Sequence, residues 1–278
     1  MKGLTEGAIL SLKSPLARVV EVHEALSSTQ DRARELARAG TLHGTLVVAG
    51  VQTGGRGRLR RAWGSPEGGL WMSLVLRPDL EAAAAPRVTQ TAAVAVAKAL
   101  RELGANVGIK WPNDLLAEPG GRKICGILAE SSIRTGGPNE TPRVDYAVLG
   151  VGLNANLDPE DLGVTDREVA TLRHELGRDV EPSYLLRHLL QNLEEELGRI
   201  HDFAAILNDW RALSVTLGEY VRVSRSGEIL EGRAVDLGPG GALLLQTADG
   251  LVELYEGEVE RLRRDVGERT VPGQVSWP

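Results

Sequence analysis

The sequence changes in character after Trp210, and this change divides the chain. Residues 219–262 hold five short runs of strand-forming residues, separated by turn sequences such as SRSG, GPGG and ADG. Short strands separated by turns of this kind are typical of small antiparallel barrels. The pattern therefore predicts an SH3-like β-barrel over residues 216–265, after a main domain over residues 1–215. Residues 266–278 are expected to form a loose tail.

The main domain mixes apolar strands with amphipathic helices, which favours an α+β fold. Residues 124–131 and 144–151 are expected to pair as central strands, because a turn-rich segment separates them. The predicted strands cover residues 45–51, 70–76, 107–111, 124–131 and 144–151. The predicted helices cover residues 27–39, 86–103 and 182–206, the last packing a leucine-rich side into the core.

Composition excludes several classes of protein. With 42% hydrophobic and 25% charged residues, the chain resembles an ordinary soluble globular protein. No run of about 18 apolar residues predicts a transmembrane helix. The single cysteine excludes a disulfide framework, and the five histidines show no metal-ligand spacing, so no metal site is predicted. The net charge of −6 argues against general nucleic-acid binding. These observations together favour the cytoplasm.

Lysine is scarce relative to arginine. Only five of the 32 basic residues are lysines, namely Lys2, Lys13, Lys98, Lys110 and Lys123. The abundance of Ala, Gly, Arg and Leu points to a coding bias that replaces lysine wherever any cation suffices. A lysine that persists is a candidate for a site that needs a compact ammonium group.

A long loop rich in glycine and arginine follows the predicted strand at 45–51. It runs over residues 52–69 and contains Gly54-Gly55-Arg56-Gly57-Arg58, with Trp63 behind. Glycines let backbone N–H groups approach a ligand, and arginines offer planar donors to carboxylate or phosphate. The loop is interpreted either as an anion cradle or as a mobile, solvated basic turn. It is neither a Walker loop nor a dinucleotide fingerprint.

Three further segments place polar residues at strand ends. Lys110-Trp111-Pro112-Asn113-Asp114 suits either a ligand site or a turn that caps a strand. Lys123 enters an apolar strand, where it meets an anion or extends to solvent. Gly126, in the same strand, suggests close approach of a ligand or backbone, whereas Cys125 is interpreted as a packing residue. Asn154 and Asn156 follow Gly150 and Gly152 at the end of another strand, where a simple terminating turn would also explain them.

Taken together, these segments resemble the biotin–protein ligase family, also called biotin–[acetyl-CoA-carboxylase] ligases. The combination of GRGR, KWPND and K-x-x-G-I-L is specific, and the match runs from about residue 20 to residue 263. The segments that carry the resemblance are Ser28-Thr29-Gln30, Gln52, Gly55–Arg58, Trp63, Lys110–Asp114, Arg122-Lys123, Gly126–Leu128 and Gly152–Asn154.

The resemblance implies a mixed central sheet with flanking helices, of the class II synthetase-like kind, with the small barrel appended. It implies a ligase that converts biotin and ATP into biotinyl-5′-AMP and then acylates a lysine of a biotin carboxyl carrier domain. That domain belongs to a biotin-dependent carboxylase. Mg²⁺ is expected on the triphosphate.

The resemblance also assigns roles to residues, with Lys123 and Arg58 as the catalytic pair. It assigns biotin binding to Ser28, Thr29, Gln30, Gln52, Arg56, Gly57, Arg58, Lys123 and Gly126. It assigns ATP or adenylate binding to Arg56, Arg58, Trp63, Lys110, Asn113, Lys123 and Asn154.

Two departures and two alternatives accompany the resemblance. The family often has Asn where this chain has Gln30, which puts a direct ligand contact there in doubt. About 20 residues precede the match, too few for the DNA-binding domain of the family's repressors, so no nucleic-acid partner is expected. A lipoate–protein ligase and a regulator that binds biotinyl-adenylate without ligating it remain as alternatives. A homodimer formed by edge strands around residues 124–151 is also possible.

Overall fold

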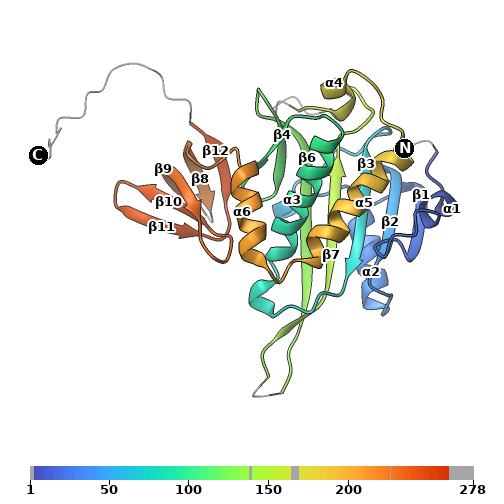
Figure 1. The fold of residues 1–278 in the computed structure, drawn as a ribbon, viewed down its shortest axis with the longest axis horizontal. Helices are drawn as coiled ribbons and strands as arrows, with labels where there is room; N and C mark the ends of the chain where they lie inside the picture. The colour runs from blue at the N-terminus through green and yellow to red at the C-terminus, as the bar shows by residue number, and fades with distance from the viewer. Residues whose placement is uncertain (1–2, 138–139, 164–168, 226, 263–278) are drawn as a thin grey trace, which may run out of the picture.

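A computed structural model describes residues 3–137, 140–163, 169–225 and 227–262. These residues form a large α+β domain and a small β domain at its C-terminal side (Figure 1). Between the last strand of the large domain (Arg143–Leu153) and the first strand of the small one, the described residues form three α-helices.

The large domain is built on a seven-stranded sheet in the order β1-β2-β3-β7-β6-β5-β4. The edge strand β1 runs parallel to β2, and every other neighbouring pair is antiparallel, so the expected mixed sheet is confirmed. Its strands are β1 (Val19–Leu26), β2 (Thr45–Gln52), β3 (Leu70–Leu76), β4 (Val107–Lys110), β5 (Asp114–Ala117), β6 (Arg122–Arg134) and β7 (Arg143–Leu153).

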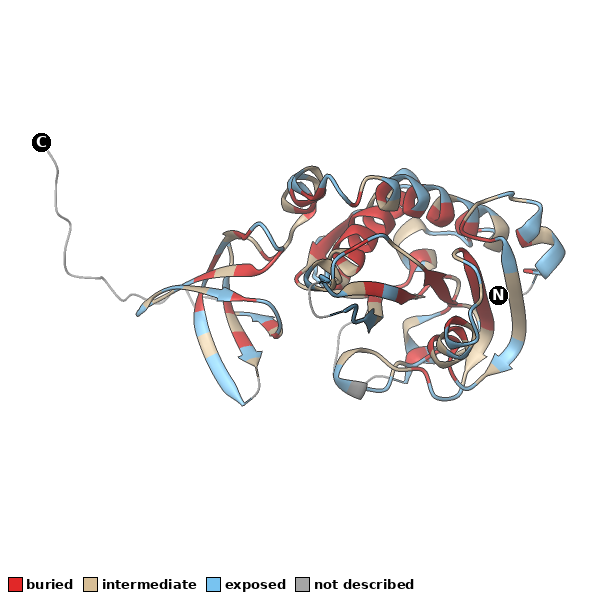
Figure 2. Ribbon diagram, turned by 90° about the horizontal axis from the view of Figure 1, so that it is seen from below, coloured by how far each residue is buried: buried red, intermediate tan, exposed pale blue. Residues whose placement is uncertain are grey.

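Helices lie on both faces of this sheet. Figure 2 shows buried residues concentrated where the main helical layer meets the strands. The long helices α3, α5 and α6 form that layer, whereas α2 packs on β2, β3 and β7 from the other side. The helices are α1 (Glu6–Leu10), α2 (Thr29–Arg38), α3 (Arg87–Glu102), α4 (Leu172–Leu176), α5 (Pro182–Gly198) and α6 (Phe203–Leu213).

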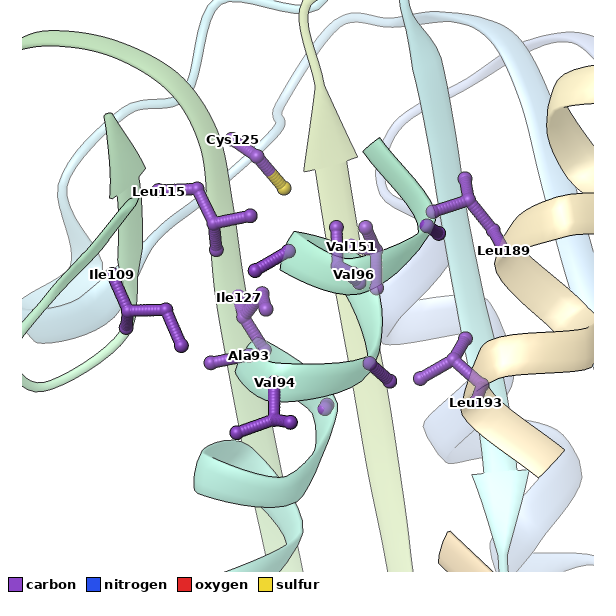
Figure 3. Close-up of a cluster of buried hydrophobic side chains, with 14 of the residues drawn as sticks. Ala93, Val94, Val96, Ile109, Leu115, Cys125, Ile127, Val151, Leu189 and Leu193 are labelled. Carbon is purple, nitrogen blue, oxygen red and sulfur yellow. The ribbon is translucent and has the colours of Figure 1, made fainter. Parts of the chain in front are cut away.

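The side chains of each strand alternate between two hydrophobic cores, because successive side chains point to opposite faces of the sheet. On β6, Cys125 and Ile127 face the main helical layer and join its hydrophobic core (Figure 3). On β7, Val148 instead packs with Ala33 and Ala37 of α2. Gly126, Leu128 and Glu130 alternate with Cys125 and Ile127 and consequently belong to the α2 side, where the functional site lies. Lys123 also reaches that side, because the pairing of β5 with β6 shifts register between Leu115 and Leu116.

The prediction of a single helix over residues 182–206 is wrong, because the segment contains two helices. The first, α5, ends at Gly198, a poor helix former, and the chain turns through Arg199–His201. The Asp202 side chain then accepts a hydrogen bond from the Ala205 N–H and caps α6. The break lets α6 pack on α3 and β4 rather than continue away from the domain.

The core between α3 and α5 predicts a stability effect. Leu193 is fully buried in the main cluster, close to the α3 side chains that Figure 3 shows. Leu193→Ala is expected to lower the free energy of unfolding by about 2–5 kcal/mol. Chemical denaturation measures it, with Leu42→Ala as control, since Leu42 is 61% exposed. Equal stabilities of the two variants would contradict this packing.

The C-terminal domain is an antiparallel five-stranded sheet in the order β11-β10-β9-β8-β12. The SH3-like class is confirmed, but the described strands form an open sheet, in which β11 and β12 do not pair with each other. The predicted tail at 266–278 lies outside the described residues. The strands are β8 (Tyr220–Arg225), β9 (Glu228–Leu237), β10 (Leu243–Thr247), β11 (Gly250–Leu254) and β12 (Glu258–Arg261).

In the order of the large sheet β7 is an interior strand, whereas β5 covers the outer side of β6 along only part of its length, so an edge remains there. β7 pairs with β3 and β6, whereas β5 pairs with β6 only as far as Gly126. Homodimer formation therefore stays a prediction. None of the helices in the described part of the chain has the length and apolar character needed to cross a membrane.

Candidate active site

A cavity of about 1650 Å³ opens on the α2 side of the large sheet and extends to the C-terminal domain. Its volume exceeds the 300–1,000 Å³ typical of small-molecule sites, so it suits a large ligand or two ligands together. All thirteen predicted site residues line it. Sequence reasoning assigned no role to Ser73, Asp114 or Gly152, which also line it, or to Glu130 beside it. The alternation of residues on β3, β6 and β7 could have found three of these four.

A network of hydroxyl and amide groups forms one end of the cavity. The Thr29 N–H and hydroxyl both donate to Gln52 Oε1, at 2.8 and 3.0 Å, and Gln52 Nε2 donates to Ser65 Oγ at 2.9 Å. One N–H of the Gln52 amide remains for a ligand. The Ser28 oxygen caps α2 by accepting from the Asp31 N–H, and its hydroxyl proton stays available as a donor.

Gln30 does not fit the biotin contact expected for it. Its side chain is buried, and its Nε2 donates to Val148 O at 2.9 Å and to Glu130 Oε2 at 3.0 Å. Its Oε1 accepts from Ser73 Oγ at 3.1 Å. Both donors of the amide therefore bind protein oxygens, and Gln30 supports the wall of the cavity instead. A Cβ at Gly150 would lie 2.6 Å from Gln30 Oε1, so the longer side chain requires glycine there.

The glycine- and arginine-rich loop folds back over the cavity. Its two limbs pair through isolated bridges between Arg56 and Ala62 and between Gln52 and Ser65. Arg58 Nη1 donates to Asn113 Oδ1 at 3.1 Å and to the Gly257 carbonyl of the C-terminal domain at 3.4 Å. Burial lowers the pKa of Arg58, while the nearby carboxylate of Asp114 opposes that shift. The loop therefore holds one arginine inside the cavity and bridges the two domains.

The guanidinium of Arg56 lines the cavity and is held by two carboxylates of the chain, and its ligand role stays a prediction. It donates to Glu130 Oε1 at 2.9 Å and to Asp31 Oδ1 at 2.8 Å. These two contacts anchor the Arg56 side chain through its Nη atoms.

Trp63 lies on a floor made of two glycines. A Cβ at Gly152 would approach Trp63 Nε1 to 2.7 Å, and one at Gly126 would approach the ring to 3.0 Å, so only glycine leaves the indole enough room. The indole N–H is buried and has no hydrogen-bond partner in the described part of the chain. An unpartnered buried donor that lines a cavity is available to a ligand acceptor.

Lys123 is the cation at the centre of this arrangement. Its Nζ lies 2.7 Å from Asp114 Oδ1 and 4.8 Å from the centre of the Trp63 ring, and its side chain is 19% exposed. It meets an anion, as one of the two sequence interpretations proposed. The neighbouring Cys125 faces the core, where burial raises the pKa of its thiol, in agreement with a packing role.

Two asparagines complete the other end of the cavity. Asn154 Nδ2 donates to Ala170 O at 3.0 Å and to Lys123 O at 3.4 Å, whereas its buried Oδ1 has no partner among the described residues. Asn113 Nδ2 donates to Ile127 O at 2.8 Å, which orients its Oδ1 toward Arg58. Lys110 ends β4 and lines the same cavity.

Comparison with known proteins agrees with this geometry. Residues 22–154 match the biotin/lipoate A/B protein ligase family, and residues 216–262 match the biotin protein ligase C-terminal domain. The bifunctional ligase/repressor BirA of Bacillus subtilis is 37% identical over 243 residues, which cover 86% of this chain and 72% of BirA. The chain belongs to the biotin protein ligase family.

Other biotin protein ligases extend the comparison. The biotin–[acetyl-CoA-carboxylase] ligase of Paracoccus denitrificans is 33% identical over 226 residues, which cover 77% of this chain and 88% of the relative. A biotin protein ligase of Aquifex aeolicus, solved in complex with biotin and ATP, aligns with a TM-score of 0.70 at 27% identity. That alignment covers 88% of this chain and 99% of the other. The family and the fold class predicted from the sequence are therefore confirmed.

Proposed function

We propose that the chain activates biotin with ATP as biotinyl-5′-AMP and transfers the biotinyl group to a lysine of a biotin carboxyl carrier domain. Family membership supports the ligase class. The match of residues 216–262 supports biotin over lipoate as the substrate, because the matching domain family is described for biotin protein ligases. The observation that carries the proposal is the order of groups along β7, which suits an elongated ligand with different ends.

Strand β7 sets that order. Gly150 pairs with Ser73 of the amide and hydroxyl network, Gly152 lies under Trp63, and Asn154 follows beside the backbone of Lys123. Four residues of extended chain span about 13 Å. A neutral polar head therefore fits at Gly150, an anionic centre at Lys123, and a nucleotide base at the unpartnered oxygen of Asn154.

The network at Gln52 suits the ureido head of biotin. The free N–H of its amide and the Ser28 hydroxyl are donors for the ureido oxygen, while the Thr29–Gln52 contacts fix the orientation of the amide. A ligand without the ureido group would leave these groups unpaired, and such sites discriminate strongly. Lipoate has no ureido group, so the network favours biotin.

Lys123 and Arg58 suit the first step. A biotin carboxylate oxygen attacks the α-phosphorus of ATP, the bond to the bridging oxygen breaks, and pyrophosphate leaves. The transition state gathers negative charge, which fixed cations in a partly dry cavity stabilise. Lys123, which pairs with Asp114, and Arg58, held by Asn113, are the cations that this proposal assigns to that charge.

The second step needs no nucleophile from this chain. The carrier lysine amine attacks the carbonyl carbon of the adenylate, loses a proton, and expels AMP. The buried thiol of Cys125 takes no part, because it faces the opposite side of β6. Meanwhile the loop that carries Trp63 shields the mixed anhydride from water.

Mg²⁺ fits this site as a companion of the triphosphate. Within the described residues, no cluster of three His, Cys, Asp or Glu side chains could hold a metal ion by itself. The carboxylates of Asp114 and Glu118 line the cavity, and Mg²⁺ commonly binds through one or two carboxylates together with substrate phosphates. The ion would neutralise charge on the leaving pyrophosphate.

The partner that we propose is the carrier domain of a biotin-dependent carboxylase, met in the cytoplasm, with no nucleic-acid partner. The test is exchange of labelled pyrophosphate into ATP, measured separately with biotin and with lipoate. We expect exchange with biotin only. Exchange with lipoate alone would reject the biotin ligase in favour of a lipoate ligase.

A further inference from the structure

Glu130 collects donors from two separate parts of the chain. Its carboxylate accepts hydrogen bonds from Gln30 Nε2 at 3.0 Å, from Arg34 Nη2 at 2.6 Å and from Arg56 Nη1 at 2.9 Å. Gln30 and Arg34 belong to α2, whereas Arg56 belongs to the glycine-rich loop. Glu130 itself, on β6, is not among the described residues that line the cavity, so a direct ligand contact does not explain this convergence.

Asp31 completes a clamp around Arg56. Its Oδ1 accepts from Arg56 Nη2 at 2.8 Å and from Arg34 Nη1 at 2.9 Å. Two carboxylates thus hold the guanidinium of Arg56 from two directions, and its side chain is 22% exposed. Partial burial and several simultaneous partners make such contacts stronger than an isolated surface ion pair.

The clamp fixes more than one side chain, because the backbone at Arg56 carries the loop stem. Arg56 bridges to Ala62, and the Trp63 N–H donates to Gly55 O at 2.8 Å. Holding Arg56 therefore holds the limb that places Trp63 on Gly126 and Gly152. The limb also lies next to Gln52, whose amide contacts Ser65.

We propose that Glu130 is a positioning residue for the ligase reaction, acting through Arg56 to hold the glycine-rich loop closed over the biotin end of the cavity. This inference rests on the proposed function for its ligand, biotin. A purely structural Glu130 would instead act through Arg34, by tying α2 to the sheet. The two roles differ in which arginine the effect of Glu130 depends on.

The experiment is a pair of double-mutant cycles, read by biotin-dependent pyrophosphate exchange and by thermal unfolding. Glu130→Gln is expected to raise the KM for biotin roughly tenfold, with kcat and Tm near the wild-type values. Arg56→Gln is expected to do the same, and the double variant should be no worse than the poorer single. Arg34→Gln should change KM little, and its effect should multiply with that of Glu130→Gln. Glu35→Gln is the control, because Glu35 is an exposed acid of α2 whose one ion pair among the described residues is with Arg32.

A second readout does not depend on activity. Trypsin cleavage within the arginine-rich loop should be faster in Glu130→Gln than in the wild type or in Glu35→Gln, because the loop opens more often. Three outcomes would overturn the proposal. The KM for biotin could be unchanged in Glu130→Gln, the effects of Glu130→Gln and Arg56→Gln on KM could multiply, or the KM could rise only together with a lowered Tm. If Glu130→Gln does not fold, Arg56→Gln tests the proposal instead, because an unchanged KM for biotin in that variant would also overturn the proposal. A wild-type chain without biotin-dependent exchange would reject the proposed function, while the trypsin comparison would still test the clamp.

Discussion

Replacing Lys123 with arginine is expected to lower the rate of biotin-dependent pyrophosphate exchange roughly 100-fold, although the charge is kept. The ammonium group fits between the Asp114 carboxylate, 2.7 Å away, and the face of Trp63. A planar guanidinium is larger and directs its donors in a fixed fork, so it would displace Trp63 or miss the two reacting anions. Steady-state exchange with varied biotin and ATP measures the loss.

Lys98→Arg is the matched control for this variant. Lys98 is also paired with carboxylates, Glu196 at 2.7 Å and Asp209 at 2.8 Å, but it lies on α3 in the opposite layer. A more extended cation can keep those contacts, so exchange and Tm should stay near wild type. A Lys123→Arg enzyme within threefold of wild-type activity would show that the site needs a positive charge and not an ammonium group.

Replacing Gly152 with alanine is expected to reduce biotin-dependent pyrophosphate exchange by roughly 100-fold, because the added methyl group would occupy the space that the Trp63 indole needs. The added Cβ would lie 2.7 Å from Trp63 Nε1, and ordinary carbon contacts begin beyond 3.4 Å. The indole has to move, and the loop that carries it moves as well. Kinetics with biotin and ATP, together with intrinsic tryptophan fluorescence, measure the two effects.

Gly198→Ala controls for the general cost of replacing a glycine. Gly198 ends α5, and a Cβ there would meet no atom within 4 Å. We expect wild-type exchange from that variant. Wild-type kinetics in Gly152→Ala, with an unshifted fluorescence spectrum, would mean that the position of Trp63 does not matter for the reaction.

Much of the fold could be predicted because local pattern and tertiary structure agree. The five turn-separated runs after residue 218 became β8–β12, and the apolar segments at 45–51 and 70–76 became β2 and β3. Strand β1 escaped notice because its residues are half-exposed at the sheet edge and include Glu21, His23 and Glu24. Strand β5 is only four residues long and follows a Pro-Asn turn, so nothing distinguished it from a loop.

The candidate site was predictable as a set of residues, but not as a set of contacts. Motifs far apart in sequence placed all thirteen residues on one cavity. Gln30 and Arg56 both donate hydrogen bonds to Glu130, which lies 100 positions after Gln30 and 74 positions after Arg56 in the sequence. Only the antiparallel register of β6 and β7 brings Glu130 opposite Val148 and beside α2. Sequence spacing does not contain that register.

The most direct measurement of the central claim is transfer of biotin to a biotin carboxyl carrier domain, followed by mass spectrometry of the carrier. The ligase account predicts one biotinyl group on one carrier lysine, formed only when biotin and ATP are both present and abolished when that lysine is replaced. Pyrophosphate exchange with biotin but no modified carrier would contradict the account and favour a regulator that binds biotinyl-adenylate without transferring it.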